Sequence, residues 1–188
     1  MTPAILFDLE FTAWDGSMRH HWLRPGEFKE VVQIGAVKLD PRTLEVLDTF
    51  DVLVRPRINP AISPYLEKLT GITNDTLLAK GRDFVPAYAD FLAFAGDGIL
   101  SAFGRDDFVF EENERLYGLG ATPRPEFRDA RPWFRANGFE THGLHSCDIG
   151  PRLGVPFEGQ KHNALADSRS VAAGMRVLVQ RGAKSLFV

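Results

Sequence analysis

The sequence is poor in cysteine and has no long hydrophobic run. Its single cysteine, Cys147, has no partner for an internal disulfide bond, which excludes the disulfide-rich secreted class. No apolar stretch approaches the roughly 20 residues that cross a bilayer, and no basic start leads into an apolar signal segment. We therefore expect a protein of the reducing cytoplasm that makes no contact with a membrane.

The chain also lacks an excess of positive charge. Lysine and arginine number 22 against 25 aspartates and glutamates, so the formal net charge is -3. This balance argues against a protein that grips nucleic acid over its whole surface, although it allows a local site. With 188 residues, 44% of them hydrophobic, the chain suits one globular domain spanning residues 1–188.

Two acids stand near the end of the first strand-forming segment, residues 5–12. Side chains alternate along a strand, so Asp8 and Glu10 are expected on one face and Leu9 on the other. Carboxylates this close raise each other's pKa unless a cation lies between them, and Mg²⁺ suits oxygen ligands. Two solvated acids at a strand end are the alternative that this segment alone leaves open.

The order of the remaining segments predicts an α/β fold. A hairpin follows the first strand, because two strand patterns flank a short turn at residues 40–43. Helical patterns then alternate with two more strands. We expect a central mixed sheet of five strands, the first three antiparallel, with helices on both faces. The strand segments are residues 5–12, 31–39, 44–54 and 99–103 and a short strand at Phe127.

Helix starts are marked by residues whose side chains cap the first turn. Thr73 or Asn74, Asp129 and Asn163 are the candidate caps, and Asn163 opens a helix over residues 164–181. The other expected helices cover residues 64–69, 84–95, 105–117, 130–137 and 145–153. Residues 13–30 show neither hydrophobic period and are predicted to be a long loop.

Further acids and a histidine occur at two of these helix starts. Asp106 and Asp107 open the helix after the fourth strand, where acids also suit the helix dipole. His162 and Asp167 bracket the start of the last helix and can both face the end of the sheet. A lone histidine is more often structural, but a strand-borne Asp-x-Glu, a later acid and a His-x4-Asp form a demanding combination.

These three segments resemble the motifs of a known family. Residues 7–12, 103–107 and 162–167 are similar to the three motifs of the DnaQ-like 3′-to-5′ exonucleases of the histidine-bearing DEDD type (DEDDh). That family has the ribonuclease H-like fold. Residues 33–36 and 54–73 are similar to the branch that trims RNA 3′ ends, so the resemblance covers nearly the whole chain.

The resemblance implies an activity and a site. The expected activity is metal-dependent hydrolysis of phosphodiester bonds from the 3′ end of single-stranded nucleic acid, RNA somewhat favoured over DNA, with release of nucleoside 5′-monophosphates. His162 is the implied general base, and a pair of Mg²⁺ or Mn²⁺ ions is held by Asp8, Glu10, Asp107 and Asp167. Asp107 is preferred over Asp106 because it stands three residues after Gly104, as in the family motif.

The resemblance implies substrate contacts at only a few positions of this sequence. The resemblance implies that the backbone around Phe11 and Thr12 holds the 3′ end, while Leu69 and Ile72 wedge against the terminal base. The loop at residues 13–30 is longer than in minimal members and includes Trp14 among basic residues. We expect it to contribute to strand binding, unless its tryptophans pack on the core.

Two other functions compete with this interpretation. Asp-x-Glu-x-Thr after an apolar strand also resembles the first motif of haloacid-dehalogenase-type phosphatases, whose leading aspartate is a nucleophile. That class needs a helix after the first strand, where this sequence predicts a hairpin, and it gives His162 no role. An inactive nucleic-acid-binding member of the exonuclease fold is the second alternative.

Overall fold

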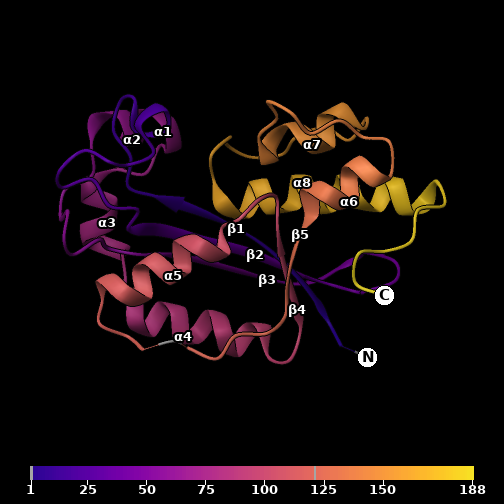
Figure 1. The fold of residues 1–188 in the computed structure, drawn as a ribbon, viewed down its shortest axis with the longest axis horizontal. Coiled ribbons are helices and arrows are strands. Elements are labelled where there is room, and N and C mark those ends of the chain that lie inside the picture. The colour runs from indigo at the N-terminus through magenta and orange to yellow at the C-terminus, as the bar shows by residue number, and fades with distance from the viewer. Residues whose placement is uncertain (1, 121) are drawn as a thin grey trace.

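Five strands form a mixed sheet at the centre of the molecule (Figure 1). The computed structural model describes residues 2–120 and 122–188. The strand order is β3-β2-β1-β4-β5, in which β1–β2 and β2–β3 pair antiparallel and β1–β4 and β4–β5 pair parallel. This confirms the predicted sheet. The strands are β1 (Ala4–Phe11), β2 (Val31–Leu39), β3 (Val46–Leu53), β4 (Ile99–Ala102) and β5 (Phe127–Asp129).

Helices cover both faces of this sheet. Helices α4 and α5 lie on one face, α6, α7 and α8 lie on the other, and α1, α2 and α3 gather at one end (Figure 1). None of the described helices is long and apolar enough to traverse a bilayer. Their bounds are α1 Ser17–His20, α2 Pro64–Thr70, α3 Asn74–Lys80, α4 Phe84–Ala95, α5 Asp107–Leu116, α6 Ala130–Ala136, α7 Ser146–Arg152 and α8 Ala164–Gln180. The one-turn helix α1 lies inside the segment that the sequence predicted to be loop.

Side-chain caps begin three of these helices where the sequence predicted them. Thr73, Asp129 and Asn163 each accept a hydrogen bond from a backbone N–H in the first turn of the following helix. Such bonds satisfy donors that have no partner within the helix. Asn163 matters most for the site, because it starts the helix that carries Asp167.

Alternation along β1 divides the core into two clusters. Phe7 and Leu9 pack with residues of α4 and α5, while Leu6 packs with residues of α8. Because successive side chains point to opposite faces, Asp8 and Glu10 fall on the α8 side with Leu6. The two acids are thereby directed toward the helix that carries the later motif.

A fully buried carboxylate immediately before β2 holds the loop that leads to α2. Glu30 has 0% of its surface exposed. Four donors surround the charge and compensate its burial. They are the backbone N–H groups of Arg57 (2.9 Å), Ile58 (2.8 Å) and Asn59 (2.6 Å) and the hydroxyl of Tyr117 (2.9 Å).

Removing this carboxylate is expected to destabilise the protein strongly. In Glu30→Ala, the N–H groups of Arg57, Ile58 and Asn59 lose their carboxylate acceptor, which should lower the free energy of unfolding by about 2 to 3 kcal/mol. Urea titration followed by circular dichroism measures the loss. Glu158→Ala removes an exposed glutamate and serves as the control. Equal stability of the two variants would contradict the role assigned to Glu30.

Candidate active site

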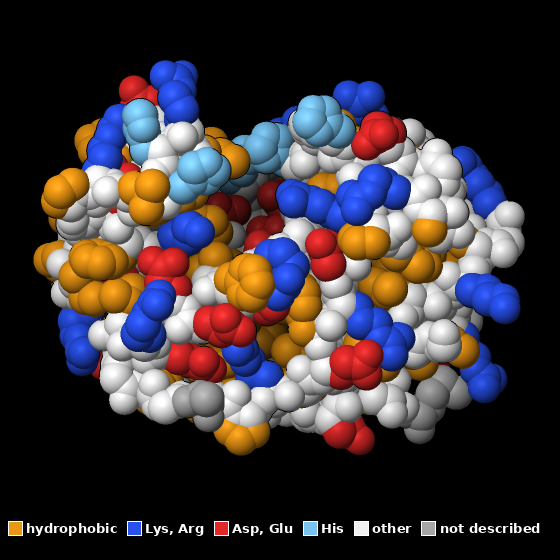
Figure 2. Space-filling model, viewed as in Figure 1, with side chains coloured by type: hydrophobic (Ala, Val, Ile, Leu, Met, Phe, Trp, Pro, Cys, Tyr) orange, Lys and Arg blue, Asp and Glu red, His pale blue; other side chains and the backbone are white. Residues whose placement is uncertain are grey.

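A cavity of about 220 Å³ lies beside the carboxyl end of β1. Figure 2 shows a hollow with acidic side chains at its base and histidines along its rim. The cavity has an acidic side and an apolar side. The polar lining is Asp8, Glu10, Asp106, Asp167, His145, Ser146, His162 and Arg131, and the apolar lining includes Phe11, Met18, Trp22, Tyr65 and Leu69.

Close packing of α8 on β2 brings the late motif to the two acids of β1. A Cβ at Gly35 would lie only 2.1 Å from the backbone nitrogen of Leu165, so this contact requires glycine. The side chain of Gln33 accepts a hydrogen bond from the N–H of Ala164 (3.0 Å), and Ser168 Oγ donates to the carbonyl of Gly35 (3.0 Å). Gly35 pairs with Asp8 across the sheet, so α8 begins beside the acids.

His162 and Asp167 reach this position as the sequence predicted. One potential ligand atom from each of Glu10, His162 and Asp167 lies within 4.8 Å of the other two. His162 has a φ of 58°, in the left-handed region that few non-glycine residues adopt. Such conformations cost free energy and concentrate at functional sites, which agrees with the position of His162 at the cavity.

The fourth carboxylate of the cavity is Asp106, so the choice of Asp107 is wrong as to which acid faces the site. Asp106 lines the cavity and accepts a hydrogen bond from the N–H of Leu9 (3.2 Å). Both oxygens of Asp107 instead accept hydrogen bonds from Arg105 (2.9 and 2.7 Å), whose guanidinium stacks on Phe108 at 3.7 Å.

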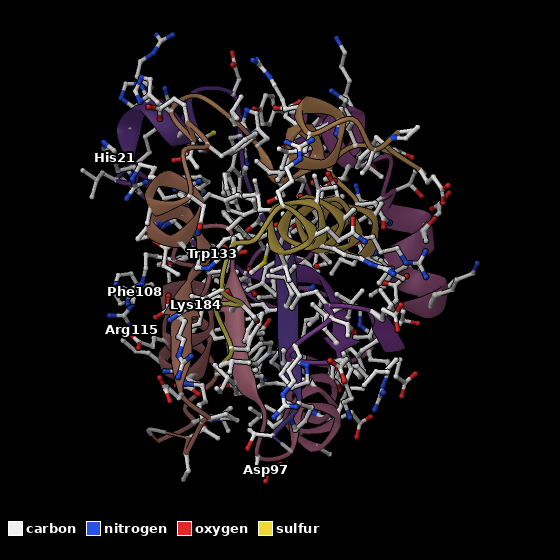
Figure 3. The ribbon with its side chains drawn as sticks, turned by 90° about the vertical axis from the view of Figure 1, so that its right-hand side faces the viewer. His21, Asp97, Phe108, Arg115, Trp133 and Lys184 are labelled. Carbon is white, nitrogen blue, oxygen red and sulfur yellow. The ribbon has the colours of Figure 1, made fainter. Side chains whose placement is uncertain are left out.

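Helix geometry explains this correction. Successive residues at the start of a helix point about 100° apart, so two adjacent acids cannot both face one cavity. Asp107 lines a different cavity, with Phe110 and Arg124, and the next residue, Phe108, lies at the surface in Figure 3. Asp106 precedes the first helical residue but makes no side-chain capping bond, because its carboxylate is directed to β1.

The four carboxylates of the cavity repel one another when they are ionised. Burial, with the charges of Asp106 and Glu10 as the next causes, raises the pKa of Asp8 well above its usual range. Burial and the charge of Asp167 raise the pKa of Glu10 in the same direction. Burial also raises the pKa of both Asp106 and Asp167 to about 7. Bringing these groups together as anions therefore costs free energy unless a cation neutralises them.

The donor set fits divalent cations. Asp167 Oδ1 is buried and has no hydrogen-bond partner among the described residues. A buried carboxylate oxygen without a partner costs free energy, and coordination to a cation would supply the missing interaction. Hard oxygen donors with an excess of negative charge are the ligands that Mg²⁺ and Mn²⁺ prefer.

Three polar residues of the site were missed by the sequence reasoning. Ser146 Oγ donates a hydrogen bond to Asp8 Oδ1 (2.9 Å) from the first turn of α7. The ring of His145 lies 5.6 Å from that of His162, and Arg131 lines the cavity from α6. The sequence predicted a helix from residue 145 but gave no signal that Ser146 would face Asp8, because that contact depends on how α7 packs.

The expected substrate residues divide into two groups. Phe11 and Leu69 line the apolar side of the cavity. Thr12 is buried, and its hydroxyl donates to the carbonyl of Phe28. Ile72 is buried in a core cluster with Leu66 and does not line the cavity. Phe11 and Leu69 are thus at the cavity, Ile72 is not among the described residues that line it, and the expected role of the backbone at residues 11 and 12 stays a prediction.

The loop at residues 13–30 contributes part of the apolar side. Trp22 lines the cavity, packs on Phe11 with ring centroids 5.5 Å apart, and donates from its indole N–H to the carbonyl of Thr12 (2.8 Å). Met18 lines the cavity from α1, with 65% of its surface exposed. Trp14 is partly buried and is not among the described residues that line this cavity.

The sequence comparison and the structural comparison both match this chain to exonucleases. The RNase T family model, described as exonuclease, matches residues 5–174. Human 3'-5' exoribonuclease 1 is 39% identical over 71 residues, covering 37% of this chain and 18% of the relative. Bovine ERI1 exoribonuclease 3 is 25% identical over 172 residues, covering 82% of this chain and 49% of the relative. The chain thus spans about half or less of these curated relatives.

Solved structures with the same fold are also nucleases. The nuclease domain of 3'hExo, described as a DEDDh family member bound to rAMP, superposes with a TM-score of 0.81 at 24% identity and covers 99% of this chain and 96% of that one. Exonuclease I gives a TM-score of 0.72 at 15% identity, covering 97% of this chain and 42% of that one. The match to the exonuclease family and the antiparallel pairing of β1 with β2 together exclude the phosphatase alternative.

The corrected choice of acid can be tested by metal binding. Asp106→Asn should weaken Mn²⁺ binding by at least about tenfold, because it removes a charged ligand candidate from the cavity. Asp107→Asn should change the affinity by less than about twofold, because its carboxylate binds Arg105. Calorimetric titration gives both values. A greater loss in Asp107→Asn would instead support Asp107 as the metal ligand.

Repulsion within the cavity predicts that stability depends on metal. At a Mn²⁺ concentration about 100-fold above its dissociation constant, linkage adds about 2.7 kcal/mol, which should raise Tm by roughly 5 to 10 °C above its value in chelator. In Asp106→Asn, Tm in chelator should be higher and the rise on adding Mn²⁺ smaller. Identical wild-type melting curves with chelator and with Mn²⁺ would contradict the inferred repulsion.

Proposed function

Because the chain belongs to the RNase T exonuclease family, we propose that it is a metal-dependent 3′-to-5′ exonuclease. It removes nucleoside 5′-monophosphates from the 3′ end of a single strand, with RNA favoured over DNA. One observation carries the proposal. Four carboxylates, contributed by β1, the start of α5 and α8, line one cavity together with His162.

Asp8, Glu10, Asp106 and Asp167 would hold the metal, as a pair of Mg²⁺ or Mn²⁺ ions. When bound, the ions would activate a water molecule and stabilise negative charge on the reacting phosphate. The hydrogen bond from Ser146 to Asp8 fixes one of these carboxylates from α7. The N–H of Leu9 fixes Asp106 in the same way, so the acids are held before substrate arrives.

His162 acts as the general base. Burial, with lesser contributions from His145 and Lys161, lowers the pKa of His162 below its ordinary value. Its imidazole is therefore largely neutral near pH 7 and can accept the proton of an attacking water molecule. The carboxylates are poorer bases for this step, because the metal would occupy their oxygens.

The apolar side of the cavity receives the terminal nucleoside. Phe11, Trp22, Tyr65 and Leu69 line the same cavity of about 220 Å³ as the acids. Stacking of a base on one aromatic side chain contributes about 1 to 3 kcal/mol and does not depend on base identity. This arrangement suits an enzyme that removes successive nucleotides of any sequence.

The preference for RNA rests on the relatives. Two of the curated relatives are named exoribonucleases, and one solved structure of the same fold is described as bound to rAMP. Another is described as recognising the stem-loop of histone mRNA. The expected substrate is therefore the free 3′ end of an RNA strand.

A degradation assay tests the proposal. Single-stranded RNA and DNA of equal sequence, labelled at the 5′ end, are incubated with Mg²⁺, Mn²⁺ or chelator. The expected result is a ladder that shortens from the 3′ end, with nucleoside 5′-monophosphates as product, faster for RNA and absent in chelator. Strand binding without any hydrolysis would instead establish an inactive binding protein.

Replacing His162 should separate the base from the metal ligands. His162→Ala should lower kcat by on the order of 10² to 10⁴-fold, which is the usual contribution of a general base. Mn²⁺ affinity should change little, because the four carboxylates remain. Single-turnover hydrolysis and calorimetric titration measure the two effects. Loss of Mn²⁺ binding in His162→Ala, with binding intact in Asp106→Asn, would move His162 into the metal shell.

A further inference from the structure

A second cavity, of about 610 Å³, adjoins the active-site cavity. The two share Met18, Arg131 and His145 in their linings, so they lie side by side. In Figure 2, Lys and Arg side chains lie at the edge of the acidic hollow. We call this second cavity the arginine cleft, after Arg131 and Arg135 in its wall.

The guanidinium of Arg131 forms no hydrogen bond and no ion pair with a described side chain, although its charge is near enough to Asp106 to oppose the rise in that carboxyl's pKa. Only its backbone N–H has a hydrogen-bond acceptor, the carboxylate of Asp129 (2.9 Å). The guanidinium lies over the ring of Phe103, 4.9 Å from its centroid. A Cβ at Gly104 would stand 3.1 Å from its Cζ, so the glycine leaves room for it. The group is held in place, and its N–H donors remain available to a ligand.

Arg135 is similarly positioned and similarly available. Its guanidinium donates one hydrogen bond, to Thr141 Oγ1 (3.1 Å). Glu140 is the one acid among the described residues that line the cleft, and its carboxylate accepts the N–H groups of Thr141 (2.7 Å) and His142 (2.8 Å). These bonds and the charge of Arg135 keep the pKa of Glu140 low, so two arginines face one carboxylate. The cleft therefore has an excess of positive charge and adjoins a cavity that is anionic without metal.

The spacing of the two arginines suits a polyanion. They are four residues apart on α6, so they occupy one face of the helix at a separation of roughly 6 Å along its axis. Two consecutive phosphates of an extended strand could each meet one guanidinium. Arginine binds phosphate oxygens through paired N–H donors, which gives both charge and direction.

We infer that the arginine cleft binds the backbone phosphates of the nucleotides that immediately precede the one being removed. This inference rests on the proposed function, because it places the same strand across both cavities. Arg131 lies at the junction and meets the phosphate nearest the cavity, while Arg135 meets the next one along. Both are positioning residues that contribute affinity for longer strands.

Binding of strands of different length tests this placement. His162→Ala, which slows hydrolysis, provides the background in which a fluorescent RNA of six nucleotides is titrated with Mg²⁺ present. Adding Arg135→Ala should raise Kd by about fivefold and reduce the slope of log K against log salt by about 0.7, the value for one phosphate contact on a single strand. Kd for a dinucleotide should stay within about twofold, because its backbone ends before the cleft.

Arg115→Ala is the matched control. Arg115 is exposed on α5, projects from the outer surface in Figure 3 and lines neither cavity. It should leave both dissociation constants unchanged. Equal effects of Arg135→Ala and Arg115→Ala on the six-nucleotide strand would overturn the inference, as would equal effects of Arg135→Ala on the two strand lengths. A loss confined to a duplex with a 3′ overhang would assign the cleft to the opposite strand and overturn it too.

Failure of the inference and failure of the proposed function give different results. If wild-type protein hydrolyses RNA and Arg135→Ala binds strands of both lengths normally, the proposed exonuclease activity is supported and phosphate binding in the arginine cleft is rejected. If wild-type protein hydrolyses nothing while Arg135→Ala binds the longer strand more weakly, the cleft stands as a strand-binding site and the nuclease proposal fails.

Discussion

The contact between the start of α8 and the backbone of β2 determines where every other part of the site lies. It depends on a position without a side chain, Gly35, because any Cβ there would overlap the backbone of the helix. From this contact α8 presents Asp167 to the acids of β1, and the preceding turn presents His162. A larger residue at position 35 would displace two groups of the site at once.

That same contact assembles a cluster that opposes folding. Buried carboxylates with raised pKa values favour the unfolded chain at neutral pH, so the hydrophobic clusters on both faces of the sheet must offset their repulsion. Cation binding would offset the unfavourable free energy of this repulsion. Structural stability and readiness for catalysis are in this way coupled through one group of side chains.

Strand periodicity and helix capping were enough to predict, from the sequence, the site residues that lie on regular elements. The period of a strand placed Asp8 and Glu10 on one face, and a cap at Asn163 placed Asp167 near the start of α8, where the structure has it in the first turn. The choice between Asp106 and Asp107 failed because it depends on the direction in which α5 leaves the sheet. Ser146 and Arg131 could not be found either, since tertiary packing of α6 and α7 brings them to the cavity.

The hydrogen bonds that Glu30 accepts from residues 57–59 connect the apolar wall of the cavity to the sheet. The three backbone partners of Glu30 precede α2, which carries Tyr65 and Leu69 to the cavity. If these hydrogen bonds were lost while the sheet stayed folded, the acids would remain in place, but the apolar wall on which we propose that the terminal nucleoside rests would be displaced. Damage at Glu30 would then resemble an altered substrate preference, although the residue is fully buried and touches no substrate.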